Sequence, residues 1–80
     1  MNTEIIHSNL SEAIEELVSI ENALASGSLD EGEFTVMLQH AYHHINFAWN
    51  IRNIPTSAYT SLTQEQFELW GSYPKDLDCY

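Results

Sequence analysis

The chain has 80 residues, enough for one domain, and carries 12 acidic side chains against two basic ones, Arg52 and Lys75, for a formal net charge of −10. This excess of carboxylates disfavours nucleic acid and anionic membrane surfaces, which attract lysine and arginine, and it favours a partner protein with a basic surface. No apolar run approaches the ~18 residues of a membrane span, and no basic region precedes an apolar run at the N-terminus, so we expect a cytoplasmic protein without a signal peptide.

The first predicted element is a helix over residues 3–26. Apolar residues recur there at alternating steps of four and three, as on one stripe of a helix: Ile6, Leu10, Ala13, Leu17, Ile20 and Leu24. Ile14 and Val18 widen this stripe. Thr3 suits the N-cap and Gly27 suits the C-terminal stop, so the helix is expected to end just before this glycine.

A turn over residues 27–30 is predicted to lead into a second helix over residues 31–54. Asp30 is followed three residues later by Glu33, a capping-box spacing that satisfies the first amides of a helix. A second stripe with the same steps follows: Phe34, Leu38, Ala41, Ile45, Ala48 and Arg52. Pro55 prevents regular continuation. Because the turn is so short, the two helices are expected to form an antiparallel hairpin.

The last third is predicted as a loop over residues 55–62, a short helix over residues 63–70 and a docked tail over residues 71–80. Thr63 has Gln66 three residues on, which is again a capping-box spacing. Large apolar side chains are frequent in this third: Tyr59, Phe67, Leu69, Trp70, Tyr73 and Leu77. So much apolar surface favours docking onto the hairpin over a solvated tail.

The second helix has no charged face. Residues 34–51 contain no Asp, Glu, Lys or Arg, and a helix that is apolar on all sides is normally buried on more than one side. One neighbouring helix covers one side only. We therefore predict an all-α fold in which two copies form a homodimeric four-helix bundle. The alternatives are a monomer sealed by its tail and a monomer with an exposed groove for another protein.

Three histidines, His40, His43 and His44, lie on or near one side of the second helix. The hairpin geometry is expected to bring His40 near Glu16 and His44 near Glu12. A neighbouring carboxylate favours the charged imidazole and raises its pKa. The hairpin is therefore predicted to gain stability as the pH falls through the raised histidine pKa.

The same three histidines, His40, His43 and His44, are also an alternative metal site, because two histidines at a spacing of four can chelate a transition metal. The neighbouring sequence supplies no third and fourth ligand. Cys79 stands alone, without a partner for a disulfide or a CxxC site, and is interpreted as an incidental thiol. We accordingly expect no bound metal and no cofactor.

Polar residues near the end of the second helix are expected to make contacts of their own. Arg52 is predicted to pair with Glu4 or with an acid of the tail. Asn46, Asn50 and Asn53 share the side of the helix that faces away from the apolar stripe. They are predicted to form hydrogen bonds to a partner or to the returning tail.

No phosphate-binding glycine loop and no nucleophile motif is present in the sequence, so no enzymatic activity is expected. The composition favours an interaction module, namely an inhibitor or regulator of the immunity, antitoxin or phage anti-defence type, that binds a basic protein surface by charge complementarity. The residues predicted to contact this partner are Glu12, Glu15, Glu16, Glu21, Phe47 and Trp49. A metal- or ligand-binding bundle and a structural homodimeric subunit are the alternatives.

Overall fold

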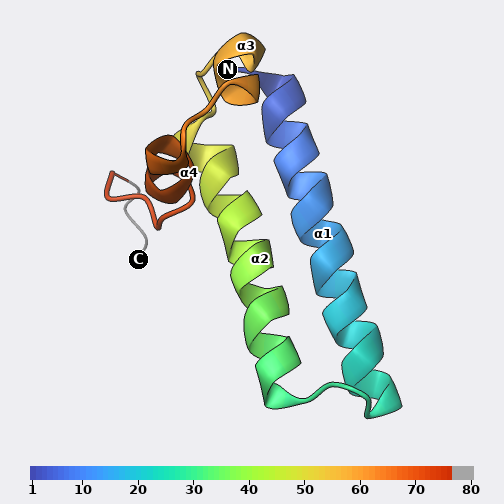
Figure 1. Cartoon of the computed structure of the whole chain (residues 1–80). Helices are drawn as coiled ribbons and strands as arrows, with labels where there is room; N and C mark the ends of the chain where they lie inside the picture. Colours follow the sequence, from blue (N-terminus) through green and yellow to red (C-terminus); the bar gives the residue numbers. More distant parts are fainter. Residues whose placement is uncertain (77–80) are drawn as a thin grey trace.

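The computed structural model describes residues 1–76, and every regular element in this range is a helix. In chain order the helices are α1 (Thr3–Ser26), α2 (Glu31–Asn50), α3 (Thr56–Thr60) and α4 (Gln64–Trp70). Figure 1 shows α1 and α2 side by side as an antiparallel hairpin, with α3 and α4 gathered at the end opposite the turn. The predicted all-helical hairpin is confirmed.

The N-terminus of α1 is capped by Asn2. The sequence had predicted Thr3 as the cap, so that prediction is wrong by one residue. The Asn2 side chain accepts a hydrogen bond from the amide of Ile5 at 3.3 Å and donates one to the carbonyl of Ile54 at 2.8 Å. One side chain therefore caps the helix and ties it to the segment after α2. At the other end Gly27 adopts φ 71, a left-handed conformation that costs little without a Cβ, and α1 stops where predicted.

Helix α2 begins as predicted and ends earlier than predicted. Asp30 is the N-cap, accepting from the amide of Glu33 at 2.8 Å. Regular α-helix ends at Asn50, although Pro55 would have allowed it to reach residue 54. The carbonyl of Arg52 instead accepts from the amide of Asn2 at 2.6 Å. Helix α2 thus ends where a backbone carbonyl of the following residues bonds to the residue that caps α1.

The segment predicted as a loop over residues 55–62 contains the short helix α3, which no sequence pattern predicted. Pro55 precedes α3 with the fixed φ that suits a helix start. The hydroxyls of Thr60 and Ser61 bond back to the carbonyl of Ser57, so the polar residues typical of loops here support a helical turn.

Helix α4 follows with the capping box predicted for it. The amide of Gln66 donates to the Thr63 hydroxyl at 3.1 Å, and the Gln66 side chain accepts from the amide of Thr63 at 2.8 Å. Both orphan donors at this helix start are satisfied. The regular helix begins one residue later than predicted, because Thr63 is the cap.

The core lies at the end of the hairpin where α3 and α4 gather. Ile5, Phe47 and Ile51 are buried there, with Ile54, Tyr59 and Trp70 packed against them. Phe47 was predicted to contact a partner, yet it is only 3 % exposed. That prediction is wrong because α3 and α4 cover the side of α2 from which Phe47 projects.

Candidate interaction surface

Helices α1 and α2 leave a row of large apolar side chains uncovered. We call this row the open face and define it by these residues and exposed fractions: Leu10 41%, Leu17 39%, Leu24 59%, Phe34 36% and Ile45 43%. Leu24 and Phe34, one from each helix, line the same hollow beside the turn. The apolar flanks of the two helices therefore lie on one side of the hairpin.

The hairpin contact itself is built largely from small residues. Ala13 and Ile20, seven residues apart on α1, are buried, and so are Ala41 and Ala48, seven residues apart on α2. The open-face leucines also recur every seven residues, at the other position of the heptad. The sequence stripes were thus correctly placed, but on α1 the hairpin buries Ala13 and Ile20 and leaves the bulkier half of the stripe, the three leucines, in solvent.

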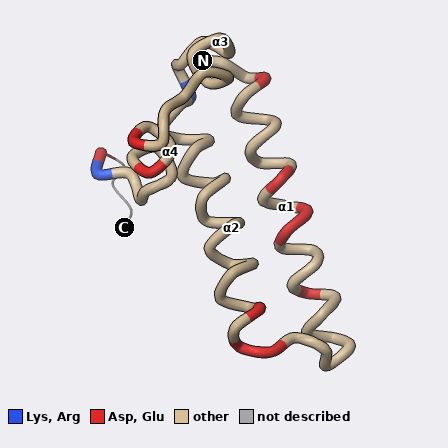
Figure 2. Tube along the Cα trace, in the orientation of Figure 1, with Lys and Arg blue, Asp and Glu red and all other residues tan. Residues whose placement is uncertain are grey.

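Carboxylates occupy the opposite flank of α1. Glu4 and Glu15 are eleven residues apart, about three helical turns, and therefore share a side with Glu12 between them. We call these three residues the acidic edge. Figure 2 shows acidic residues along α1 and around the turn, and none of the acidic edge is in an ion pair with the basic groups of residues 1–76.

Two of the acids predicted for the partner surface lie elsewhere. Glu21 is nine residues from Glu12, about two and a half turns, and so projects from the opposite side of α1. The Glu16 carboxylate is turned inward and accepts a hydrogen bond from His40 Nδ1 at 3.0 Å. Glu12, Glu15, Glu16 and Glu21 therefore do not form one continuous surface.

Two histidines of α2, His40 and His44, form hydrogen bonds to α1, and one of the two partners was predicted correctly. His40 meets Glu16, as expected. His44 does not meet Glu12: its Nδ1 donates to the side-chain oxygen of Asn9 at 2.9 Å. The Asn9 amide is oriented for this role, because its nitrogen donates to the carbonyl of Ile5 at 3.0 Å. Asn9 is only 2 % exposed and was missed because a polar residue was not expected in the hairpin contact.

The pKa of His44 is lowered, which reverses the predicted direction for this residue. Burial is the largest cause, and the neighbouring charges of His40 and His43 act in the same direction. The carboxylates of Glu12 and Glu16 oppose the shift without overcoming it. A partly buried imidazole that bonds to a neutral amide favours its uncharged form.

His43 has a packing role. Its ring lies 4.9 Å from that of Phe67 and 5.8 Å from that of Phe47, measured between centroids, and it rests on Gly71. His43, His40 and His44 line a common hollow of about 210 Å³. Within residues 1–76 no three or more His, Cys, Asp or Glu side chains are placed to hold a metal ion, and Cys79 lies outside the described range.

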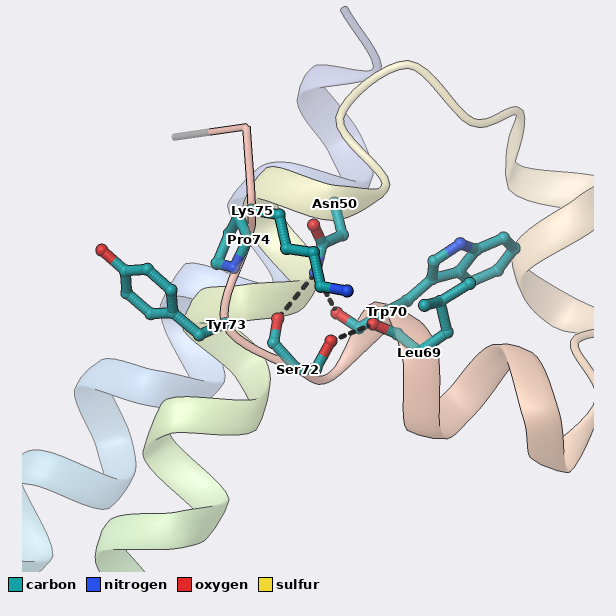
Figure 3. Close-up of a pocket in the computed structure, with 7 residues that line it drawn as sticks. All are labelled: Asn50, Leu69, Trp70, Ser72, Tyr73, Pro74 and Lys75. Atoms are coloured by element: carbon teal, nitrogen blue, oxygen red, sulfur yellow. Dashed lines mark hydrogen bonds between the residues drawn. The ribbon is translucent and has the colours of Figure 1, made fainter. Parts of the chain in front are cut away.

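The segment after α4 returns to α2 and is held there by asparagines. Asn46 donates to the carbonyl of Gly71 at 2.8 Å. Asn50 donates to the carbonyls of Trp70 at 2.7 Å and Ser72 at 2.9 Å (Figure 3). The predicted bonding of these two residues to the tail is confirmed at Gly71 and Ser72, whereas Asn53 is exposed and tail residues 77–80 lie outside the described range.

Trp49, predicted to contact a partner, is engaged by its own chain. Its indole nitrogen donates to the carboxylate of Asp76 at 2.9 Å, and the guanidinium of Arg52 lies 3.7 Å from the ring centroid. The Arg52 guanidinium also lies 3.7 Å from the Asp76 carboxylate. Of the two partners predicted for Arg52, Glu4 or an acid of the tail, the structure therefore shows the acid of the tail. The hydrogen bond from Trp49 is the main cause of a lowered pKa at Asp76, and Arg52 adds to it.

No protein-family model, curated protein or solved structure matches this chain. Across residues 1–76 no helix combines the length and the apolar character that a membrane crossing requires. A function for the chain must therefore be inferred from its own surfaces, of which the open face and the acidic edge are the most pronounced.

Proposed function

We propose that this chain is a non-enzymatic interaction module that acts as a homodimer and binds a basic surface of another protein. The observation that carries the proposal is the open face, on which five large apolar side chains are each more than one third exposed. Contiguous apolar patches are uncommon on monomeric proteins and mark sites of interaction.

A second copy is the occupant we propose for the open face, which would complete a four-helix bundle. Bundles of this kind use both apolar positions of the heptad in their core. Here one position supplies Ala13 and Ile20 to the hairpin, and the other supplies Leu10, Leu17 and Leu24 to the open face. Full burial of a leucine or phenylalanine side chain contributes roughly 1.5–3 kcal/mol, so the large side chains of the open face have the most to gain.

The acidic edge remains outside such a bundle and is the surface we propose for the basic partner. Glu4, Glu12 and Glu15 lie on the flank of α1 away from the open face. A formal charge of −10 accelerates the approach of a cationic surface and repels nucleic acid. When the basic surface is the working site of the partner, this module is an inhibitor or regulator.

The oligomeric state is the first test. Light scattering at tens of micromolar chain should give a dimer for the wild type and a monomer for Leu17→Glu, which places a charge on the open face. Val36→Glu is the matched control, because exposed Val36 lies nine residues from Ile45 and so projects from the opposite side of α2. It should remain dimeric. A clean wild-type monomer would contradict the dimer.

The partner is tested by retention of proteins from a lysate of the source cells. A basic protein should bind the wild type and be lost at about 1 M salt, where the screening length falls to about 3 Å. The double variant Glu12→Gln/Glu15→Gln should lose the same protein, and the control Glu65→Gln/Glu68→Gln on α4 should keep it. If the same protein is retained at about 1 M salt and by the Glu12→Gln/Glu15→Gln variant, the proposal is contradicted. A dimer that retains nothing would indicate a structural subunit instead.

A further inference from the structure

We infer that the two copies pack open face to open face with their hairpins antiparallel, so that the turn of one copy lies beside the α3 end of the other. This inference rests on the homodimer proposed above and fixes its arrangement. Two hairpins can meet face to face with twofold symmetry in two ways, with their turns at opposite ends or at the same end. The charges of the hairpin distinguish the two.

The open face suits a second copy in size. An α-helix rises about 1.5 Å per residue and is about 10 Å wide, so two helices packed over some 20 residues present about 30 Å by 20 Å. Contact over this area removes about 600 Å² from each copy, or about 1,200 Å² in total. That total is at the lower end of the range for stable interfaces, so the face is large enough without added elements.

The open face also suits a second copy in charge. None of its five defining residues is ionisable, and the one acid on that flank of α1 is Glu21, which lies beside Leu17 and Leu24. The acidic edge points away from it. Two chains of charge −10 can therefore meet here with most of their carboxylates turned outward.

The two ends of the hairpin differ strongly in charge. Asp30, Glu31 and Glu33 surround the turn, and no lysine, arginine or histidine occurs between residues 8 and 39. Figure 2 shows acidic residues at this end of the hairpin and no Lys or Arg. The pKa of Glu33 is raised by its side-chain hydrogen bond with Asp30 and, in addition, by the negative charge of that carboxylate. All basic groups of the hairpin lie toward the α3 end or the middle, among them His7 and Arg52.

Turns at the same end would double this carboxylate cluster, whereas antiparallel hairpins separate the two clusters by most of the bundle length. That length is about 36 Å for a 24-residue helix, several times the screening length of about 8 Å at physiological salt. The antiparallel arrangement also brings Leu10 level with Leu24 of the second copy and Leu17 level with itself, so each large residue meets another.

Two spin-label positions distinguish the arrangements, each introduced as a single cysteine into full-length chain carrying Cys79→Ser. Ser28→Cys marks the turn. Val18→Cys marks the outer side of α1, because Val18 is nine residues from Asn9, which faces α2. In the antiparallel dimer, α1 lies over α1 of the second copy. Pulsed dipolar spectroscopy should then give about 35 Å between the turn labels and about 15 Å between the Val18→Cys labels, from helix dimensions.

The reverse pattern, a short distance between turn labels and about 30 Å between the Val18→Cys labels, would overturn the antiparallel arrangement and keep the dimer. No dipolar coupling together with a monomeric mass would overturn both the arrangement and the proposed homodimer. Raising the salt to about 1 M screens the charges. If the apolar contact also favours the antiparallel arrangement, the long distance between the turn labels should stay unchanged. A switch to the short distance would show that charge alone determines the arrangement. The unchanged distance is the expected result.

Discussion

His44 and Asn9 join the two long helices through a hydrogen bond of 2.9 Å between the imidazole Nδ1 and the amide oxygen. The Asn9 nitrogen is committed to the carbonyl of Ile5, so its oxygen is the acceptor and His44 donates. This polar pair lies beside buried alanine and isoleucine side chains of the hairpin contact, and substitutions of its two residues have separate, measurable consequences.

The first prediction concerns pH. Because the pKa of His44 is lower in the folded chain than its ordinary value of 6.5, the unfolded chain binds the proton more readily. The His44 contribution to stability is therefore complete above about pH 6.5 and is lost as the pH falls toward the lowered pKa. The groups that face His44 are His40, His43, Glu12 and Glu16.

The measurement is a series of thermal melts from pH 7.5 to 5 on wild type and His44→Gln, which keeps a hydrogen-bond donor without a titrating ring. The wild type should lose more stability on acidification than the variant, at one fixed chain concentration. The difference between the two pH profiles excludes the contributions of His7, His40 and His43 to stability, because both proteins contain these residues. Parallel pH profiles would contradict the assignment to His44.

The second prediction concerns Asn9 itself. Asn9→Ala removes the acceptor of His44 and leaves a partly buried donor without its partner, which costs about 1–3 kcal/mol. Asn22→Ala is the matched control, because Asn22 is exposed on the same helix and should change stability by less than about 0.5 kcal/mol. Urea unfolding of the three chains measures both values. Equal stabilities for the two variants would show that the buried pair contributes nothing.

The third prediction concerns the contact between α2 and the segment after α4. A Cβ on Gly71 would lie 2.5 Å from Cε1 of His43, while the backbone there (φ −85) accepts any residue. Gly71→Ala should therefore destabilise the fold through this clash, by about 1–3 kcal/mol.

The cause is isolated by a double-mutant cycle. If the clash with the imidazole is responsible, Gly71→Ala should cost much less in a chain that already carries His43→Ala, with a coupling of about 0.5–3 kcal/mol. Unfolding free energies of the four chains supply the cycle. Simple additivity would mean that Gly71 acts through something other than His43.

The fourth prediction concerns the close approach of the two long helices. Ala41 is 1 % exposed, and Ala41→Leu should force α1 and α2 apart at a cost of about 1–3 kcal/mol. Ala25→Leu on exposed α1 surface is the control and should be close to neutral. Thermal melts compare the two. A neutral or stabilising Ala41→Leu would indicate a looser helix contact than the one described.

Much of the local structure followed from the sequence because its causes are local. Gly27 and Asp30 set the limits of the turn, and the capping box of Thr63 and Gln66 set the start of α4. The pairing of His40 with Glu16 was also predictable, since a short turn fixes which residues of the two helices lie level.

Other features required the tertiary structure. The end of α2 at Asn50, the cap at Asn2 and the burial of Phe47 all depend on contacts between segments about 50 or 20 residues apart, which no local pattern specifies. The pKa of His44 is another case, because burial outweighs the charge of Glu12 and only packing determines burial.

The sequence by itself determined that two amphipathic stripes would make a hairpin, because heptad spacing and capping act within each helix. Only the tertiary structure decided which half of each stripe the hairpin would bury. The alanines allow the helix backbones to approach closely, and that approach turns Leu10, Leu17 and Leu24 outward. The open face on which the proposed dimer depends is thus a product of packing geometry acting on a pattern that the sequence already contained.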